Sequence, residues 1–324
     1  MGCRSQSRCD AALHASVAPA AAAAGAPTPR AIGGLDLDSL VATRRWARRV
    51  RRRAGRRDKL VLVCNAGLAH GAGRKTREGV QLLFGSMYLA HTELYKELSP
   101  TRVVHSGSDT QIFCGSIFAP FSGACLPTDF FERPAQGGGC SAQGGGSSAH
   151  GWASAPAASA AAAWPRSLAE AMGLSLPNGV LGGSDLMDYP RSKAALALHA
   201  AALARRGHRA YSVSFPWVQT AIVGWMRMGL DWSRLGVIPK AETAVAPLLF
   251  AALASDAAID AKGHNGGSFV SGSQALRPAL AQPWFWGQNT TELSERLWEE
   301  SDKLRAELAP GAWRRLARIL LRKQ

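Results

Sequence analysis

The chain has 324 residues, of which 47% are hydrophobic and 19% are charged, and its formal net charge is +15. This length and composition indicate a globular protein with enough core for one large α/β domain or two modest ones. No stretch reaches the roughly twenty consecutive apolar residues of a membrane-spanning helix, because the best candidate, residues 244–254, is too short.

The cysteines and the N-terminal residues bear on the cellular compartment. The six cysteines form no Cys-x-x-Cys pair and no zinc-binding spacing with histidine, and no clear secretory signal precedes them. We therefore expect an intracellular protein with reduced thiols, without a disulfide framework or a metal site. Residues 1–30 are rich in Ala, Arg and Ser and contain one acid, Asp10, a composition that fits an organelle transit peptide.

An arginine-rich stretch follows a short apolar segment at residues 31–37. Residues 44–59 contain nine arginines and one lysine against a single acid, and they continue a helical pattern that begins at about Ser39. Trp46 and Val50 interrupt the charges at loosely helical spacing. This pattern favours a solvated helix face over a docking site for an anionic partner, and we expect no nucleic-acid partner.

Strand and helix patterns alternate in the next part of the chain. Residues 59–64 are a continuous apolar run, typical of a parallel strand buried on both faces, and the turn signal Asn65-Ala66-Gly67 follows directly. A helical pattern covers residues 78–98. A second short strand, at residues 102–105, ends at Ser106-Gly107-Ser108.

Regular patterns stop between residues 112 and 184, where glycine and alanine tracts indicate a low-complexity, flexible insertion within the domain. They resume with a helix at 189–206, a strand at 209–215, a helix at 242–254, a strand at 268–271 and a helix from residue 292. Strands that alternate with helices of this length predict a doubly wound, mostly parallel sheet of Rossmann-like type, in a single domain over residues 1–324.

Tyr189 and Lys193 are the residues most suggestive of chemistry. They lie four apart, so a helix places both side chains on one face. A phenol has an ordinary pKa near 10, and a neighbouring ammonium lowers that pKa, which makes the phenol a usable acid or base. Such a phenol can protonate or deprotonate a substrate oxygen while a hydride is transferred to or from the adjacent carbon. The spacing by itself is weak evidence.

Further motifs occur around this pair in a fixed order along the chain. They are Leu35-Asp36-Leu37, Cys64-Asn65-Ala66-Gly67, Phe84-Gly85 with Leu89-Ala90-His91, Ser106-Gly107-Ser108, residues 215–220 and residues 295–301. In this order they resemble the short-chain dehydrogenase/reductase family, and specifically its retinol-dehydrogenase-like branch. The resemblance covers most of the chain outside the insertion.

The resemblance implies an NAD(P)-dependent oxidoreductase that interconverts a hydroxyl and a carbonyl on a small, lipophilic substrate. It makes Tyr189 the acid/base and Ser108 the donor to the substrate oxygen. Lys193 lowers the pKa of the tyrosine and binds the cofactor ribose. The implied cofactor-binding residues are Arg4, Asp36, Asn65, Ala66, Gly67, Lys193, Pro216, Val218 and Thr220.

The chain lacks the Gly-x-x-x-Gly-x-Gly turn at which this family binds the cofactor pyrophosphate against a helix N-terminus. Gly2-Cys3-Arg4 resembles the end of the family's second strand, so we interpret residues 1–30 as an irregular segment or strand remnant of an N-terminally truncated fold, in preference to a transit peptide. Arg4 would then pair with a 2′-phosphate, favouring NADP over NAD. Without the central first strand, the strands on either side of it must pair directly or leave an open sheet edge, and we expect weak dinucleotide binding.

Other positions also depart from the family pattern. Met87 replaces an asparagine that anchors a relay water and is expected to be a core residue, and His91 is expected to be structural. Phe215 replaces a histidine, and a glycine is missing before Trp217. Pro190 is tolerable if it lies in the first helical turn, where no amide donor is required.

Two hypotheses follow. The first is an NADP-dependent oxidoreductase, and the second is a non-catalytic relative, a binding or scaffold protein that kept the fold but lost the cofactor loop. Residues 313–323 carry basic and apolar side chains in a helical pattern, which suits either peripheral contact with an anionic membrane or docking against protein.

Overall fold

The structure is a computed structural model that describes residues 1–23, 25, 29–55, 60–68, 74–108, 185–215, 218, 239–261, 267–270, 277–278 and 290–308. Two predicted segments, the insertion at 112–184 and the amphipathic stretch at 313–323, lie outside the described residues. Within the described residues, no helix is long and apolar enough to cross a membrane.

In the part of the chain that the structure describes, a five-stranded sheet forms the centre, with its strands in the order β1-β2-β3-β4-β5. The strands are β1 Val61–Cys64, β2 Arg102–Ser106, β3 Arg209–Ser214, β4 Gly267–Val270 and β5 Arg277–Pro278. Strands β1 to β4 are parallel, and β5 pairs with β4 in the antiparallel direction. Parallel strands that alternate with helices make this an α/β fold, as predicted.

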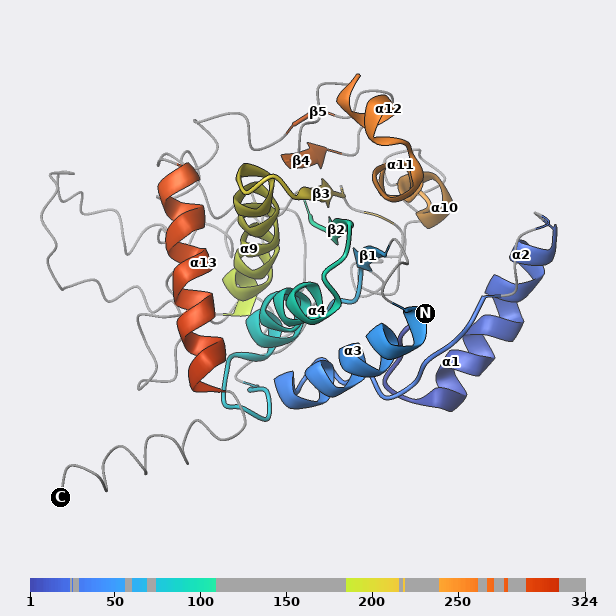
Figure 1. Ribbon diagram of the computed structural model, residues 1–324, viewed down its shortest axis with the longest axis horizontal. Helices are drawn as coiled ribbons and strands as arrows, with labels where there is room; N and C mark the ends of the chain where they lie inside the picture. The colour runs from blue at the N-terminus through green and yellow to red at the C-terminus, as the bar shows by residue number, and fades with distance from the viewer. Residues whose placement is uncertain are drawn as a thin grey trace, which may run out of the picture.

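Helices cover both faces of the sheet (Figure 1). One face is covered by α9 (Asp185–Arg205), which packs on β2, β3 and β4 and also contacts the π-helical turn η2 (Phe84–Leu89) and α13 (Thr290–Glu307). The other face is covered by α11 (Ala246–Leu253). The short helices α10 (Ala241–Ala244) and α12 (Asp256–Asp260) flank α11.

Alternation along the strands explains the two layers. Val103 of β2 and Ala210 of β3 pack with residues of α9, whereas the next residues, Val104 and Tyr211, pack with α11. All four side chains are buried. Because successive strand residues point to opposite faces, apolar residues at consecutive positions require a covering layer on each side.

From Ala194 onward, helix α9 is buried mainly through alanine and leucine side chains, which let neighbouring elements approach closely. It begins at Asp185, four residues before the predicted start. Pro190 therefore lies in the second turn, and the expectation of a first-turn proline is wrong. The helix loses one backbone hydrogen bond there, but the buried side chain of Asp188 accepts a hydrogen bond from Gln81 at 3.0 Å, which anchors this end of the helix.

Replacing Leu297 of α13 with alanine is expected to lower the free energy of unfolding by about 2–5 kcal/mol. Leu297 is fully buried in the core cluster shared by α13, α9 and η2, so the deleted atoms leave a cavity. Urea denaturation measures the effect. Glu299→Ala, at an exposed position of the same helix, is the control and should change stability by less than about 0.5 kcal/mol. Equal losses in both variants would contradict this packing.

The helical pattern ahead of β2 is shorter than predicted. Residues 82–98 are helical, with η2 leading into α4 (Ala90–Leu98), whereas the prediction starts at residue 78. The predicted helix at 242–254 is divided at Val245, because Pro247 is accommodated in the first turn of a new helix, α11.

The N-terminal residues form a long helical segment at one side of the molecule (Figure 1). It comprises α1 (Gln6–Ala12), the π-helical turn η1 (Leu13–Val17) and α2 (Ala18–Ala23). The expectation of an irregular segment at residues 1–30 is therefore wrong for residues 6–23. These residues are helical because the segment is rich in alanine, which has the highest helix propensity. Within the described residues, the expected strand remnant is reduced to a parallel bridge between Gly2 and Ile32.

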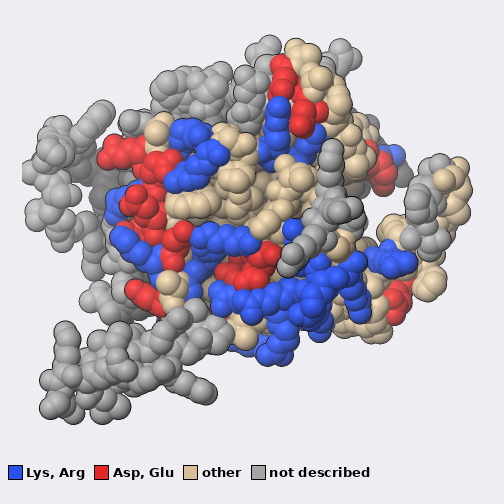
Figure 2. Space-filling view, in the orientation of Figure 1, with Lys and Arg blue, Asp and Glu red and all other residues tan. Residues whose placement is uncertain are grey.

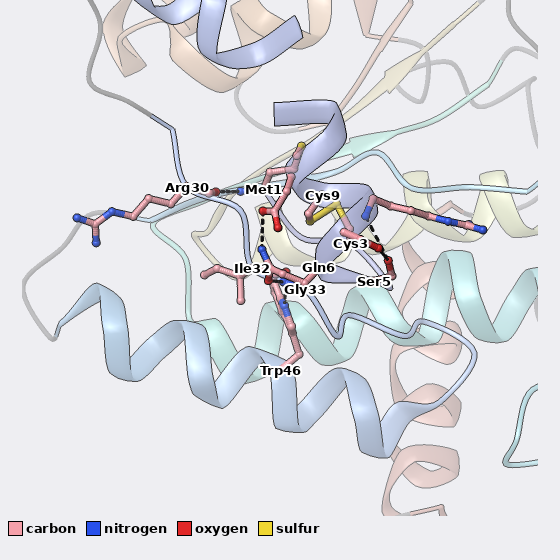
Figure 3. The surroundings of a disulfide bond; sticks show 12 residues. Met1, Cys3, Ser5, Gln6, Cys9, Arg30, Ile32, Gly33 and Trp46 are labelled. Carbon is pink, nitrogen blue, oxygen red and sulfur yellow. Dashed lines mark hydrogen bonds between the residues drawn. A yellow bond between two sulfur atoms is a disulfide. The ribbon is translucent and has the colours of Figure 1, made fainter. Parts of the chain in front are cut away.

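Cys3 and Cys9 form a disulfide bond with their Cα atoms 5.5 Å apart (Figure 3), so the prediction of reduced thiols is wrong for this pair. The side chain of Ser5 accepts a hydrogen bond from the Arg8 amide and caps α1. The helix then turns Cys9 back toward Cys3, within the range that a disulfide can span. Among the described cysteines, Cys64 is free and buried.

Strand β1 lies at the edge of the sheet within the described chain, since it pairs with β2 alone. Val61 and Val63 are 44% and 41% exposed, which is unusual for valines in a parallel strand. The predicted exposed sheet edge is therefore present in the described residues.

The arginine-rich helix α3 (Leu40–Ala54) begins directly after its N-cap Ser39, as predicted. It packs against α4, where Arg44 pairs with Glu93 at 2.6 Å and Arg48 pairs with Glu97 at 2.9 Å. Figure 2 shows a continuous band of basic side chains over this helix. The helix thus combines a buried apolar stripe with a solvated, partly ion-paired basic face.

Candidate active site

The segments that follow β1 and β2 lie next to each other, beside β3. Cys64, the last residue of β1, is in register with His105 of β2, and His105 is in register with Ser212 of β3. Beyond β2, the Gly107 amide donates to the Val213 carbonyl at 2.7 Å. Ligands of open α/β sheets bind outside the carboxyl ends of the parallel strands, so this edge is the first place to look for a site.

The three predicted catalytic residues come together at this edge. The Tyr189 hydroxyl is hydrogen-bonded to Ser108, two residues beyond β2. The Lys193 ammonium lies one helical turn from Tyr189, 5.6 Å from the centre of its ring, and donates to the Ser106 carbonyl at 2.7 Å. Ser108 and Lys193 are buried and Tyr189 is largely buried.

The pKa of Tyr189 is raised above its ordinary value, because burial disfavours the phenolate more than the hydrogen bond with Ser108 favours it. The predicted lowering by Lys193 is wrong for this arrangement, in which the ammonium is directed at the Ser106 carbonyl. Burial also lowers the pKa of Lys193 to about 8. At neutral pH Tyr189 is therefore a protonated phenol that can donate a proton.

A buried polar network fixes the first turns of α9 and was not among the predicted site residues. The carboxylate of Asp188 accepts from Gln81 and pairs with Arg191 at 3.4 Å, and the Ser192 hydroxyl donates to the Asp188 carbonyl at 2.7 Å. The signal for it in the sequence is an acid and a base, Asp188 and Arg191, close to the tyrosine at the start of a helix that becomes mostly apolar after Lys193. The network holds the backbone that carries Tyr189.

The segment Asn65-Ala66-Gly67 is exposed and lies beside Lys193. A side chain at position 67 would begin 3.2 Å from the Met87 sulfur and 3.6 Å from the Lys193 nitrogen, so glycine allows the backbone to approach both residues. Met87 is buried, as expected for a core residue, and its sulfur also accepts a hydrogen bond from the amide of residue 68 at 3.3 Å.

Arg4 and Asp36 lie together in a charged cluster of their own. Their ion pair measures 2.8 Å, Arg4 also pairs with Asp38 at 2.5 Å, and Arg77 pairs with Asp36 at 2.8 Å. The hydrogen bond with Asp38 is the largest cause of a raised pKa for Arg4. The Arg4 guanidinium is thus shared by two carboxylates, with which a cofactor phosphate would compete.

The remaining predicted cofactor contacts follow β3. Pro216 and Thr220 lie outside the described residues, and Val218 is described and partly buried.

Three histidines lie in the core near Lys193 and are absent from the predicted site. His91, His105 and His199 are each at most 3% exposed, and the His105 Nε2 atom lies 3.1 Å from the His199 Nδ1 atom. His91, expected to be structural, is buried at the start of α4 with its ring stacked on His105.

No protein-family model matches the sequence, and no curated protein is significantly similar to it.

Proposed function

We propose that this protein is an NADP-dependent oxidoreductase of the short-chain dehydrogenase/reductase type, related to the retinol-dehydrogenase-like branch. The observation that carries this proposal is the convergence of Ser108, Tyr189 and Lys193 at the carboxyl edge of the sheet. Helices on both faces of a mainly parallel sheet also support a doubly wound, Rossmann-like domain.

The chemistry follows from the arrangement of these groups. NADP supplies or accepts the hydride when it is bound. Ser108 hydrogen-bonds the substrate oxygen, and Tyr189 donates its proton to that oxygen during reduction or takes it back during oxidation. Lys193 donates to the Ser106 carbonyl, which holds the end of β2 that leads to Ser108, and its other ammonium protons would be available to the cofactor ribose.

The residues around Gly67 fit the nicotinamide ribose of a dinucleotide. The segment is exposed and its backbone approaches Lys193 closely at Gly67, so these backbone groups and Lys193 would hold the ribose. Asp36 and Arg4 would hold the adenosine end. Arg4 favours a 2′-phosphate only after it exchanges a carboxylate partner, so NAD remains the alternative cofactor.

Turnover of small lipophilic aldehydes and ketones by the purified chain, at millimolar NADPH and in parallel with NADH, tests the proposal. We expect reduction that depends on the cofactor and is faster with NADPH. Dinucleotide binding without turnover of any substrate would favour the non-catalytic alternative. Absence of binding for both cofactors would overturn the proposed function.

A further inference from the structure

Three buried side chains with metal-binding atoms converge in the core. The Cys64 sulfur and one ring nitrogen each of His91 and His105 all lie within 4.8 Å of one another. Cys64 ends β1, His105 lies beside it in β2, and His91 belongs to α4. Each of these side chains is at most 3% exposed. Three different elements thus supply one candidate ligand each.

The hydrogen bonding of the two imidazoles is incomplete within the described chain. The Nδ1 atoms of His91 and His105 are buried and make no well-formed hydrogen bond. Buried polar atoms nearly always have a partner, and an orphaned one destabilises a protein. A neutral imidazole carries its proton on one ring nitrogen and offers the lone pair of the other to a metal ion.

His199 holds one of these rings in place. Its Nδ1 atom lies 3.1 Å from the Nε2 atom of His105, and its own ring stacks on Trp298 with 5.4 Å between the centroids. Metal-bound histidines typically use their second nitrogen in such a hydrogen bond, which fixes the ring and its tautomer. His105 therefore already has the outer contact that a ligand histidine needs.

We propose that Cys64, His91 and His105 form a zinc site, with His199 as a positioning residue. One thiolate and two imidazoles are a ligand set that Zn²⁺ prefers. Zinc bond lengths place tetrahedral ligand atoms about 3.5 Å apart, so the three side chains must close by about an ångström.

Binding of the ion releases a proton. The Cys64 thiol loses its proton to solvent as the Zn–S bond forms, and the resulting thiolate offsets one charge of the ion. This compensation matters because the three ligands are buried, and an unpaired charge in the core is costly. Three protein ligands leave a fourth position for a water molecule.

Metal binding to the wild-type chain tests the site without reference to enzymatic activity, and so independently of the proposed function. The purified chain is stripped with a chelator and reloaded with Zn²⁺ or Co²⁺. We expect one ion per chain, a sulfur-to-cobalt charge-transfer band, and an X-ray absorption spectrum of the zinc form with one sulfur and two imidazole nitrogens. A zinc shell without sulfur would overturn the proposal, whatever the variants do.

Variants then assign the ligands. Cys64→Ser should remove the charge-transfer band and weaken zinc binding by more than about 100-fold, whereas His199→Gln should keep the band and weaken binding by about 10–100-fold. The matched control is the Cys3→Ser/Cys9→Ser double variant, which removes the other described cysteines and should bind zinc like the wild type. Retention of the band in Cys64→Ser, or its loss in the control, would exclude this site.

Discussion

Tyr189→Phe is expected to lower kcat by about 10²–10⁴-fold, the usual contribution of a positioned general acid. The substitution removes the proton that we assign to the substrate oxygen and leaves the aromatic ring in place. It also removes the hydrogen bond with Ser108, so stability should fall by about 1 kcal/mol. Steady-state kinetics with NADPH and a lipophilic aldehyde measure the first effect, and thermal denaturation measures the second.

Tyr95→Phe is the matched control, because it makes the same chemical change in a tyrosine of α4 whose ring packs against His199 and His208. It should retain kcat within about 2-fold. An unchanged kcat in Tyr189→Phe would remove Tyr189 from the mechanism. A large loss in both variants would point to general destabilisation in place of lost chemistry.

The raised pKa of Tyr189 predicts the direction in which pH acts on reduction. Burial keeps the phenol protonated at neutral pH, so the proton donor is present there. The rate of carbonyl reduction should therefore stay level near neutrality and decline as alkaline pH removes that proton. A pH profile of kcat in the reducing direction measures this, and a rate that rises into the alkaline range would contradict a donor role for Tyr189.

The strands are the part of the fold that the sequence predicts best. The apolar runs at residues 59–64, 102–105 and 209–215 match β1, β2 and β3 within two residues at each end. Buried parallel strands need apolar side chains on both faces, and glycine or serine residues end them, so the pattern is local. The pairing of Tyr189 with Lys193 is equally local, because helical spacing alone sets it.

Features that depend on contacts between distant segments are not predictable in this way. The disulfide depends on the turn that Ser5 begins, and the tolerance of Pro190 depends on a network that includes Gln81, more than a hundred positions away in sequence. The pKa of Tyr189 depends on burial and on where the Lys193 ammonium points. Residue types at a fixed spacing carry none of this information.

The cluster of Cys64, His91 and His105 shows the same limit. Metal motifs are recognised by short ligand spacings, and these three residues are separated by whole secondary-structure elements. They meet because β1 and β2 are neighbours in register and α4 packs beside them. The prediction of no metal site rests only on the spacing of cysteine and histidine residues in the sequence. The fold brings these three side chains close together although they are far apart in the sequence.

Lys193→Met is expected to abolish most activity and yet stabilise the fold at neutral pH. Burial lowers the pKa of Lys193 from its ordinary 10.5 to about 8, so keeping this side chain charged in the folded state costs about 3 kcal/mol at pH 7. Loss of the hydrogen bond to the Ser106 carbonyl offsets about 1 kcal/mol. The net gain in the free energy of unfolding should be about 2 kcal/mol.

The difference in stability between Lys193→Met and the wild type should depend on pH in a definite direction. Between pH 8 and 10.5 the unfolded wild type binds more protons at Lys193 than the folded wild type, so wild-type stability from this group rises with pH across that window. The advantage of Lys193→Met should therefore shrink from pH 8 upward, vanish between about pH 9.5 and pH 10, and become a deficit of about 1 kcal/mol above pH 10.5, where the neutral lysine still donates to the Ser106 carbonyl. Urea denaturation of both proteins at each pH measures the difference and cancels the titration of other groups. Lys96→Met, which removes an exposed lysine paired with Asp302, is the control and should lower the free energy of unfolding by at most about 1 kcal/mol. A Lys193→Met protein that is less stable than the wild type at pH 7 would contradict this prediction. It would mean that interactions in the folded state compensate the charge of Lys193. The site would then not contain an ammonium whose charged form is destabilised by burial.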